Sequence, residues 1–98
     1  MIVVHAKVNV KQGKKAELFA AAQALMAATR MEEGCISYVL LDDPSDETAC
    51  MFVEEWTDKP ALQRHLTTPH IAEWRQQSAE LVGGKSVLTL YEAEPTKL

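Results

Sequence analysis

The feature that most constrains the fold is a β-hairpin whose two strands are apolar on both sides. Residues 35–42 and 48–57 are rich in aromatic and branched side chains, and Asp42-Asp43-Pro44-Ser45-Asp46 between them has the composition of a turn. Pairing the strands about this turn sorts their side chains onto two faces. One face carries Ile36, Tyr38, Leu40, Cys50, Phe52, Glu54 and Trp56, and the other carries Cys35, Val39, Leu41, Met51 and Val53. Both faces are too apolar for either of them to face water.

Two further strands and a long helix surround the hairpin in the sequence. Residues 2–10 alternate loosely and are rich in valine, which predicts a strand, and residues 85–93 predict the last strand. From Lys14 to about Met31 the apolar residues recur at helical spacing. The alanines of this segment suit a helix that packs closely on a sheet.

Two short helices are predicted between the hairpin and the last strand. Thr57 or Asp58 is suited to cap the first of them, and Thr68, followed by Pro69, is suited to cap the second, which we expect to end at Gly83-Gly84. The order β-α-β-β-α-α-β is that of the ferredoxin-like split βαβ arrangement, an α+β fold with an antiparallel sheet. We expect one domain over residues 1–98.

The second apolar face of the sheet predicts a homodimer. Helices of a ferredoxin-like domain cover one face of the sheet only. A second copy of the chain, packed sheet to sheet, would cover the other face.

Composition excludes several classes of partner. The formal net charge of −4 argues against nucleic acid and against an anionic membrane surface. The sequence has no apolar run of membrane-spanning length and no signal-peptide pattern, so we expect a cytoplasmic protein. Cys35 and Cys50 lie far apart along the predicted ladder, so we interpret them as buried thiols without a disulfide.

The residues best suited to proton transfer are Glu54 and His65. Glu54 and Trp56 point to the same face of their strand, and His65 shares the inward face of the next helix with Leu62 and Leu66. A contact between Glu54 and His65 would raise the pKa of the imidazole and make it a base or a proton relay. The alternative is a structural histidine that ties the helix to the sheet.

Other candidates surround this pair. His70 lies in the first turn of the second short helix, with Trp74 one turn later, and is either part of a pocket rim or a surface residue packed on Trp74. Tyr38, Trp56 and Trp74 line an aromatic pocket or pack in the core. Asn9 either ends its strand or donates a hydrogen bond into a pocket. His65 and His70 have no clear third ligand, so we expect no metal.

Three motifs in order resemble one known family. They are Glu32-Glu33-Gly34-Cys35 with Tyr38, then Glu54-x-Trp56, then Ala61-Leu62-x-x-His65-x-x-Thr68-Pro69-His70. With these motifs the chain resembles the antibiotic biosynthesis monooxygenase family of dimeric α+β barrels, over nearly its whole length, and is most similar to small bacterial quinol monooxygenases. The pattern is also similar to an isomerase that processes a phosphorylated sugar-derived signal in quorum sensing. Haem-degrading enzymes share the fold, but their Asn–Trp–His set does not fall into register here.

The resemblance implies a cofactor-independent monooxygenase that oxidises a small quinol or phenolic compound with O2 in a homodimer. It implies catalytic roles for His65 and Glu54 and a substrate pocket formed by Trp56, Tyr38, His70 and Trp74. Asn9 matches the family's pattern only loosely. The alternatives are an isomerase of a small phosphorylated carbonyl compound and a dimeric domain that binds a small molecule without catalysis.

Overall fold

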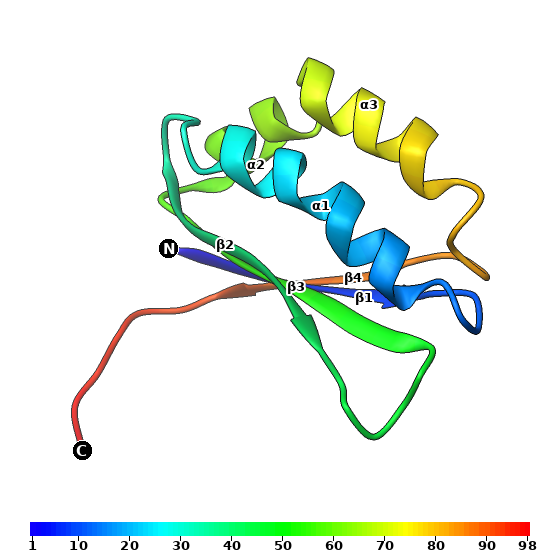
Figure 1. Ribbon diagram of the computed structural model, residues 1–98. Coiled ribbons are helices and arrows are strands. Elements are labelled where there is room, and N and C mark those ends of the chain that lie inside the picture. Colours follow the sequence, from blue (N-terminus) through cyan, green and yellow to red (C-terminus); the bar gives the residue numbers. More distant parts are fainter.

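The protein is an antiparallel sheet with all of its helices on one face (Figure 1). The computed structural model describes residues 1–98, and the strands lie in the order β2-β3-β1-β4. This is the ferredoxin-like α+β fold that the sequence predicts. The elements are β1 (Ile2–Asn9), α1 (Lys15–Thr29), β2 (Cys35–Asp42), β3 (Ala49–Trp56), α2 (Lys59–His65), α3 (Pro69–Ser78) and β4 (Val87–Glu92).

The two short helices begin at the expected caps. The carboxylate of Asp58 accepts a hydrogen bond from the backbone N–H of Ala61 at 2.9 Å, and the hydroxyl of Thr68 accepts one from Ile71 at 3.4 Å. The predicted end of the second helix is wrong, because α3 stops at Ser78. The next four residues form turns that end in a bridge between Val82 and Val10.

The core lies between the helices and the sheet. The buried face of β1 alternates along the strand, and its residues pair with buried residues of β3, as in Val4 opposite Glu54 and Ala6 opposite Phe52. Leu18 and Leu25 of α1 cover these strands from above. None of the three helices combines the length and the apolar character that crossing a bilayer requires.

A β-bulge at the start of β2 corrects the predicted faces of two residues. The register is irregular between Cys35 and Ser37, and Cys35 lies opposite the buried Trp56. Cys35 therefore packs against the core, whereas Ile36 is 53% exposed. From Tyr38 onward the predicted faces are confirmed. Both cysteines are free, and Cys50 is buried.

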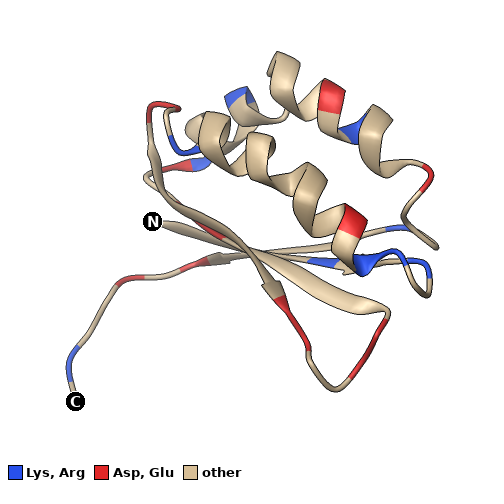
Figure 2. Ribbon diagram, in the orientation of Figure 1, with Lys and Arg blue, Asp and Glu red and all other residues tan.

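The opposite face of the sheet has no helix over it (Figure 1). Val39, Met51 and Val53 are half-buried there, and Leu41 and Tyr91 are about half exposed. Charged residues gather mainly at the ends of the elements, with acidic ones at the β2–β3 turn and lysines near the start of α1 (Figure 2).

Candidate functional site

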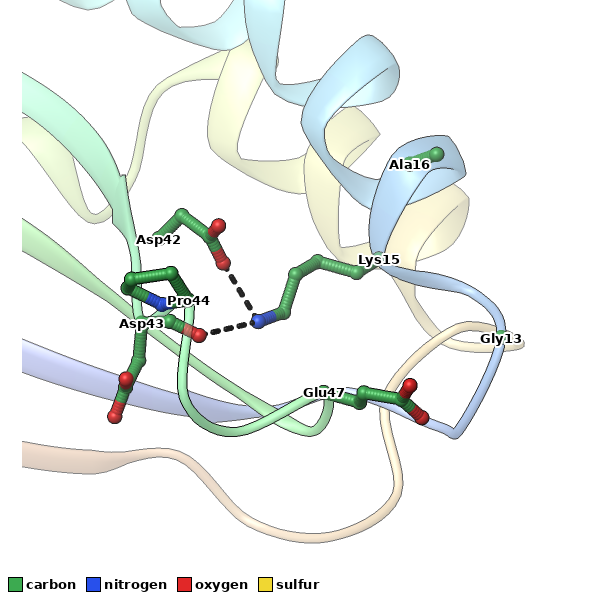
Figure 3. Close-up of a pocket in the computed structure, with 7 residues that line it drawn as sticks. All are labelled: Gly13, Lys15, Ala16, Asp42, Asp43, Pro44 and Glu47. Atoms are coloured by element: carbon green, nitrogen blue, oxygen red, sulfur yellow. Dashed lines mark hydrogen bonds and ion pairs between the residues drawn. The ribbon is translucent and has the colours of Figure 1, made fainter.

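One hollow of the surface lies between α1 and the β2–β3 turn, where Lys15 links the two (Figure 3). The ammonium of Lys15 donates to Asp42 Oδ1 at 2.6 Å and to the backbone carbonyls of Asp43 and Asp46 at 3.1 and 2.6 Å. These three acceptors match the three protons of the ammonium group. We therefore assign this lysine to holding the turn against the helix.

A second hollow lies between the sheet and helices α2 and α3, and it is the candidate site. Its volume is about 240 Å³, below the roughly 300–1,000 Å³ of pockets that hold drug-sized ligands. Ten of its fifteen lining residues are hydrophobic, and the polar ones include Glu54, His65, Arg75 and Ser78. The predicted residues Tyr38, Glu54, His65 and Trp74 all line it. Such a cavity suits a small, largely apolar molecule with a few polar groups.

Glu54 is a carboxyl group buried in the wall of this cavity. Its place on β3, opposite Val4 and Tyr38, directs it towards the helices, and it is only 4% exposed. The indole N–H of Trp56 donates to its Oε1 at 2.9 Å. Burial raises the pKa of Glu54 to about 7, although the bond from Trp56 acts in the opposite direction. Near neutral pH this group is therefore able to accept or release a proton.

His65, the last residue of α2, is paired with a carboxylate that the sequence analysis did not select. Its Nδ1 lies 2.6 Å from Oε2 of Glu32, in the loop between α1 and β2, so the predicted contact with Glu54 is wrong. The side chain is only 2% exposed. Burial lowers the pKa of His65, and the hydrogen bond to Glu32 opposes this effect only in part. The expected rise in the imidazole pKa is therefore also wrong.

His70 contacts the same oxygen of Glu32. Its Nε2 lies 2.7 Å from Oε2, and its side chain is 22% exposed at the start of α3. The sequence offered one signal for Glu32, because Glu32-Glu33-Gly34-Cys35 is among the motifs that carry the resemblance. Its contact with two histidines requires the tertiary structure.

Aromatic rings surround His65. The ring centroids of Trp56 and Tyr38 lie 4.8 and 5.3 Å from that of His65, and Trp74 packs edge-on against Phe52 at 5.6 Å. Trp56 is fully buried and is absent from the cavity wall, so its ring supports His65 and its N–H holds Glu54.

Besides Trp56, two more of the residues expected to bind substrate do not line this cavity. His70 lies behind His65, where it contacts Glu32. Asn9 is exposed and borders a separate groove with Lys7 and Met51, away from His65. Its backbone oxygen accepts a bond from Gly83, which fits the interpretation that it ends its strand.

Glu32, His65 and His70 also form a set of groups able to bind a metal, which corrects the view that the two histidines lack a third ligand. One ligand atom from each residue lies within 4.8 Å of the others. The oxygen–nitrogen distances of 2.6 and 2.7 Å are hydrogen-bond lengths. Neighbouring ligands of a tetrahedral zinc ion lie about 3.3 Å apart, since each bond to the metal is about 2.0–2.1 Å long. This geometry favours a hydrogen-bonded cluster.

Comparison with known proteins agrees with the fold and the motifs. The chain is 32% identical over 96 residues to the protein sll1783 of Synechocystis, whose name assigns it no activity, and the match covers 98% of this chain and 65% of that protein. It is 33% identical over 82 residues to the "Putative monooxygenase YcnE" of Bacillus subtilis, covering 84% of this chain and 86% of that one.

A solved structure from Nitrosomonas europaea superposes with a TM-score of 0.90, covering 95% of this chain and 98% of that one. At 20% identity, this likeness shows the fold alone. The model of the family described as "Antibiotic biosynthesis monooxygenase" matches residues 1–77. The chain therefore belongs to the antibiotic biosynthesis monooxygenase family.

Proposed function

We propose that the protein is a monooxygenase that oxidises a small quinol or phenol with O2 and needs no flavin, haem or metal. The observation that carries this proposal is the aromatic-walled cavity of about 240 Å³ with two buried proton acceptors, Glu54 and His65, in its wall. The family name and the name of the Bacillus relative support oxygen chemistry.

The chemistry needs little beyond these groups. A buried base takes the proton of the substrate hydroxyl, and the resulting phenolate is electron-rich enough to pass one electron to O2. Recombination of the two radicals forms a carbon–oxygen bond. Cleavage of the O–O bond then leaves one oxygen atom in the product and releases the other as water. A quinol supplies all four electrons and becomes a hydroxyquinone, so no external reductant is required.

In this proposal, the residues of the cavity wall have distinct roles. His65, neutral because burial lowers its pKa, is the proton acceptor nearest the aromatic rings of Tyr38 and Trp56. Glu54, with a pKa of about 7, is able to take up or return a second proton. Tyr38, Phe52 and Trp74 supply apolar surface that excludes water from the reacting ring.

The test is oxygen uptake by purified protein with a panel of one- and two-ring quinols and phenols, in the presence of a metal chelator. We expect turnover above autoxidation, and one ¹⁸O atom in the product when ¹⁸O2 is supplied. His65→Ala and Glu54→Gln should lower kcat, whereas Glu33→Gln, at an exposed carboxylate beside Glu32, should retain it. Absence of ¹⁸O from every product would contradict the proposal.

One observation favours a second candidate, an isomerase of a small phosphorylated carbonyl compound. Arg75 of α3 borders the cavity, and a guanidinium is well suited to bind a phosphate group. This candidate predicts no O2 uptake, binding of phosphorylated sugars, and loss of that binding in Arg75→Met. A domain that only binds its ligand would show neither reaction, and His65→Ala would then change only stability.

We also propose that the helix-free face of the sheet packs against the same face of a second copy. Its exposed apolar residues, among them Leu41, Val87 and Tyr91, form a surface that a second sheet would cover. A stable interface of this kind buries about 800 Å² on each partner. Light scattering should give a dimer at micromolar concentration, and Leu41→Lys should weaken it. A wild-type monomer at that concentration would contradict the proposal.

A further inference from the structure

The cluster of Glu32, His65 and His70 has a consequence for where the protons of the two histidines lie. A carboxylate oxygen carries lone pairs and only accepts hydrogen bonds. Both ring nitrogens that face Oε2 of Glu32, Nδ1 of His65 and Nε2 of His70, must therefore carry a proton. In the neutral rings the opposite nitrogens, Nε2 of His65 and Nδ1 of His70, are left as acceptors.

The free nitrogen of His65 belongs to a ring that lines the cavity. The only buried side-chain nitrogen or oxygen without a hydrogen-bond partner is Oγ1 of Thr29. Nε2 of His65 has no such partner either, so it must be accessible, and His65 lines the cavity. A neutral His65 therefore presents a lone pair to a molecule bound there.

We propose that Glu32 is a positioning residue: it holds the proton of His65 on Nδ1, so that Nε2 faces the cavity as the proton acceptor. This inference rests on the proposed function for its role in turnover, while the position of the proton can be tested without it. When Nε2 takes a proton from the substrate, the imidazolium that forms is paired with the Glu32 carboxylate at 2.6 Å. No bond other than the two to this proton changes in the step.

His70 helps to hold the Glu32 carboxylate in place. Its N–H bonds the same oxygen from the start of α3, while His65 bonds it from the end of α2. The oxygen is thus held between two helices. The Glu32 side chain is itself only 13% exposed, which limits competition from water for this oxygen.

Other charged or titratable groups near His65 come from the sheet and from α3. They are Tyr38 on β2 and Glu54 on β3, with His70 and Arg75 on α3. The carboxylate of Glu54 instead accepts the N–H of Trp56, and Nδ1 of His65 faces Glu32. Glu32 is therefore the carboxylate that sets the tautomer of His65.

The experiment is NMR of the protein labelled with ¹⁵N in its histidine rings. The chain has three histidines, and variants His5→Gln and His70→Gln assign their signals. In wild type we expect Nδ1 of neutral His65 to be protonated and Nε2 to be unprotonated, with the reverse pattern in His70. In Glu32→Ala the two nitrogen shifts of His65 should move towards each other as the tautomers mix. Glu33→Gln is the matched control and should leave them unchanged.

A second variant separates the hydrogen bond from the charge. Glu32→Gln keeps an oxygen of similar position but removes the negative charge that stabilises the imidazolium, so the pKa of His65 should fall further. With an active quinol, both Glu32 variants should lower kcat by about tenfold or more, with little change in KM. The pH dependence of kcat should shift in Glu32→Gln and remain as in wild type in Glu33→Gln.

The outcomes separate this inference from the proposed function. A proton on Nε2 of neutral His65 in wild type, or unchanged His65 shifts in Glu32→Ala, would overturn the positioning role even if the enzyme is active. If the tautomers are as expected but the protein consumes no O2, the positioning role would be supported and the oxygenase proposal contradicted. The wild-type spectrum alone decides the tautomer of His65, so the test does not depend on whether Glu32→Ala folds.

Discussion

The stability gained by replacing Glu54 with glutamine should be larger at alkaline pH than at acidic pH. Burial raises the pKa of this carboxyl from its ordinary value of 4.5 to about 7, so the folded state favours the protonated form. Below pH 4.5 the group is protonated in both the folded and the unfolded chain and costs nothing. As the pH rises through 4.5 to 7, the unfolded chain ionises first and the folded state loses stability.

The magnitude follows from the raised pKa. A rise from 4.5 to about 7 corresponds to roughly 3 kcal/mol, because each unit is worth about 1.4 kcal/mol. Glu54 is only 4% exposed, so screening by solvent reduces this figure little. Between pH 5 and pH 8 the cost of ionising the group grows by about 2.5 kcal/mol. Glutamine does not ionise, and its side-chain oxygen is still able to accept the N–H of Trp56.

The assay is urea unfolding followed by tryptophan fluorescence at pH 5, 6, 7 and 8, at one fixed protein concentration. The quantity of interest is the stability of Glu54→Gln minus that of wild type, compared between pH 8 and pH 5. Glu55→Gln is the matched control, because Glu55 lies on the opposite face of the same strand and accepts a bond from Ser37. A difference that stays the same at all four pH values would refute a raised pKa for Glu54.

Three further predictions concern single contacts. Gly34 and Gly13 both have positive φ, but a methyl group at Gly34 would lie 2.5 Å from a side-chain carbon of α2, whereas Gly13 has open space around it. In urea unfolding, Gly34→Ala should therefore lower stability by about 1–3 kcal/mol more than Gly13→Ala does. Asp58→Ala removes the cap of α2 and should lower stability by about 1 kcal/mol, and equal stability would contradict that cap. Trp56→Phe removes the N–H that bonds Glu54 and should raise the pKa of that carboxyl further, which ¹³C NMR of the labelled side chain would measure; a fall would contradict the bond.

Much of the fold was predictable because its signals are local. The apolar alternation of the hairpin gave the faces of β2 and β3 from Tyr38 onward, and the helix-start signals at residues 58 and 68 are confirmed as caps. The errors occur where local signals are weak. The bulge at Cys35 shifts the register without a glycine or proline at that residue, and α3 ends at Ser78 before any glycine.

Four residues of the candidate site were predictable, but Glu32 and the contacts of His65 were not. Strand and helix periodicity directed Tyr38, Glu54, His65 and Trp74 to the same side of the sheet, and all four line one cavity. From the same periodicity we expected Glu54 to contact His65, whereas the carboxylate that His65 contacts is that of Glu32. Glu54 lies on the correct face, but the neighbouring indole N–H already bonds it.

The sequence by itself determined the order of the elements, the N-caps of α2 and α3 and the buried faces of β2 and β3 from Tyr38 onward, since each depends on residues within a few positions of one another. Only the tertiary structure decided which carboxylate serves His65. Glu32 is 33 residues from His65 and 38 from His70, and it reaches them because its loop, between α1 and β2, packs against the end of α2 and the start of α3. A contact over such a distance in sequence leaves no periodic pattern, because it depends on the packing of three helices on one sheet.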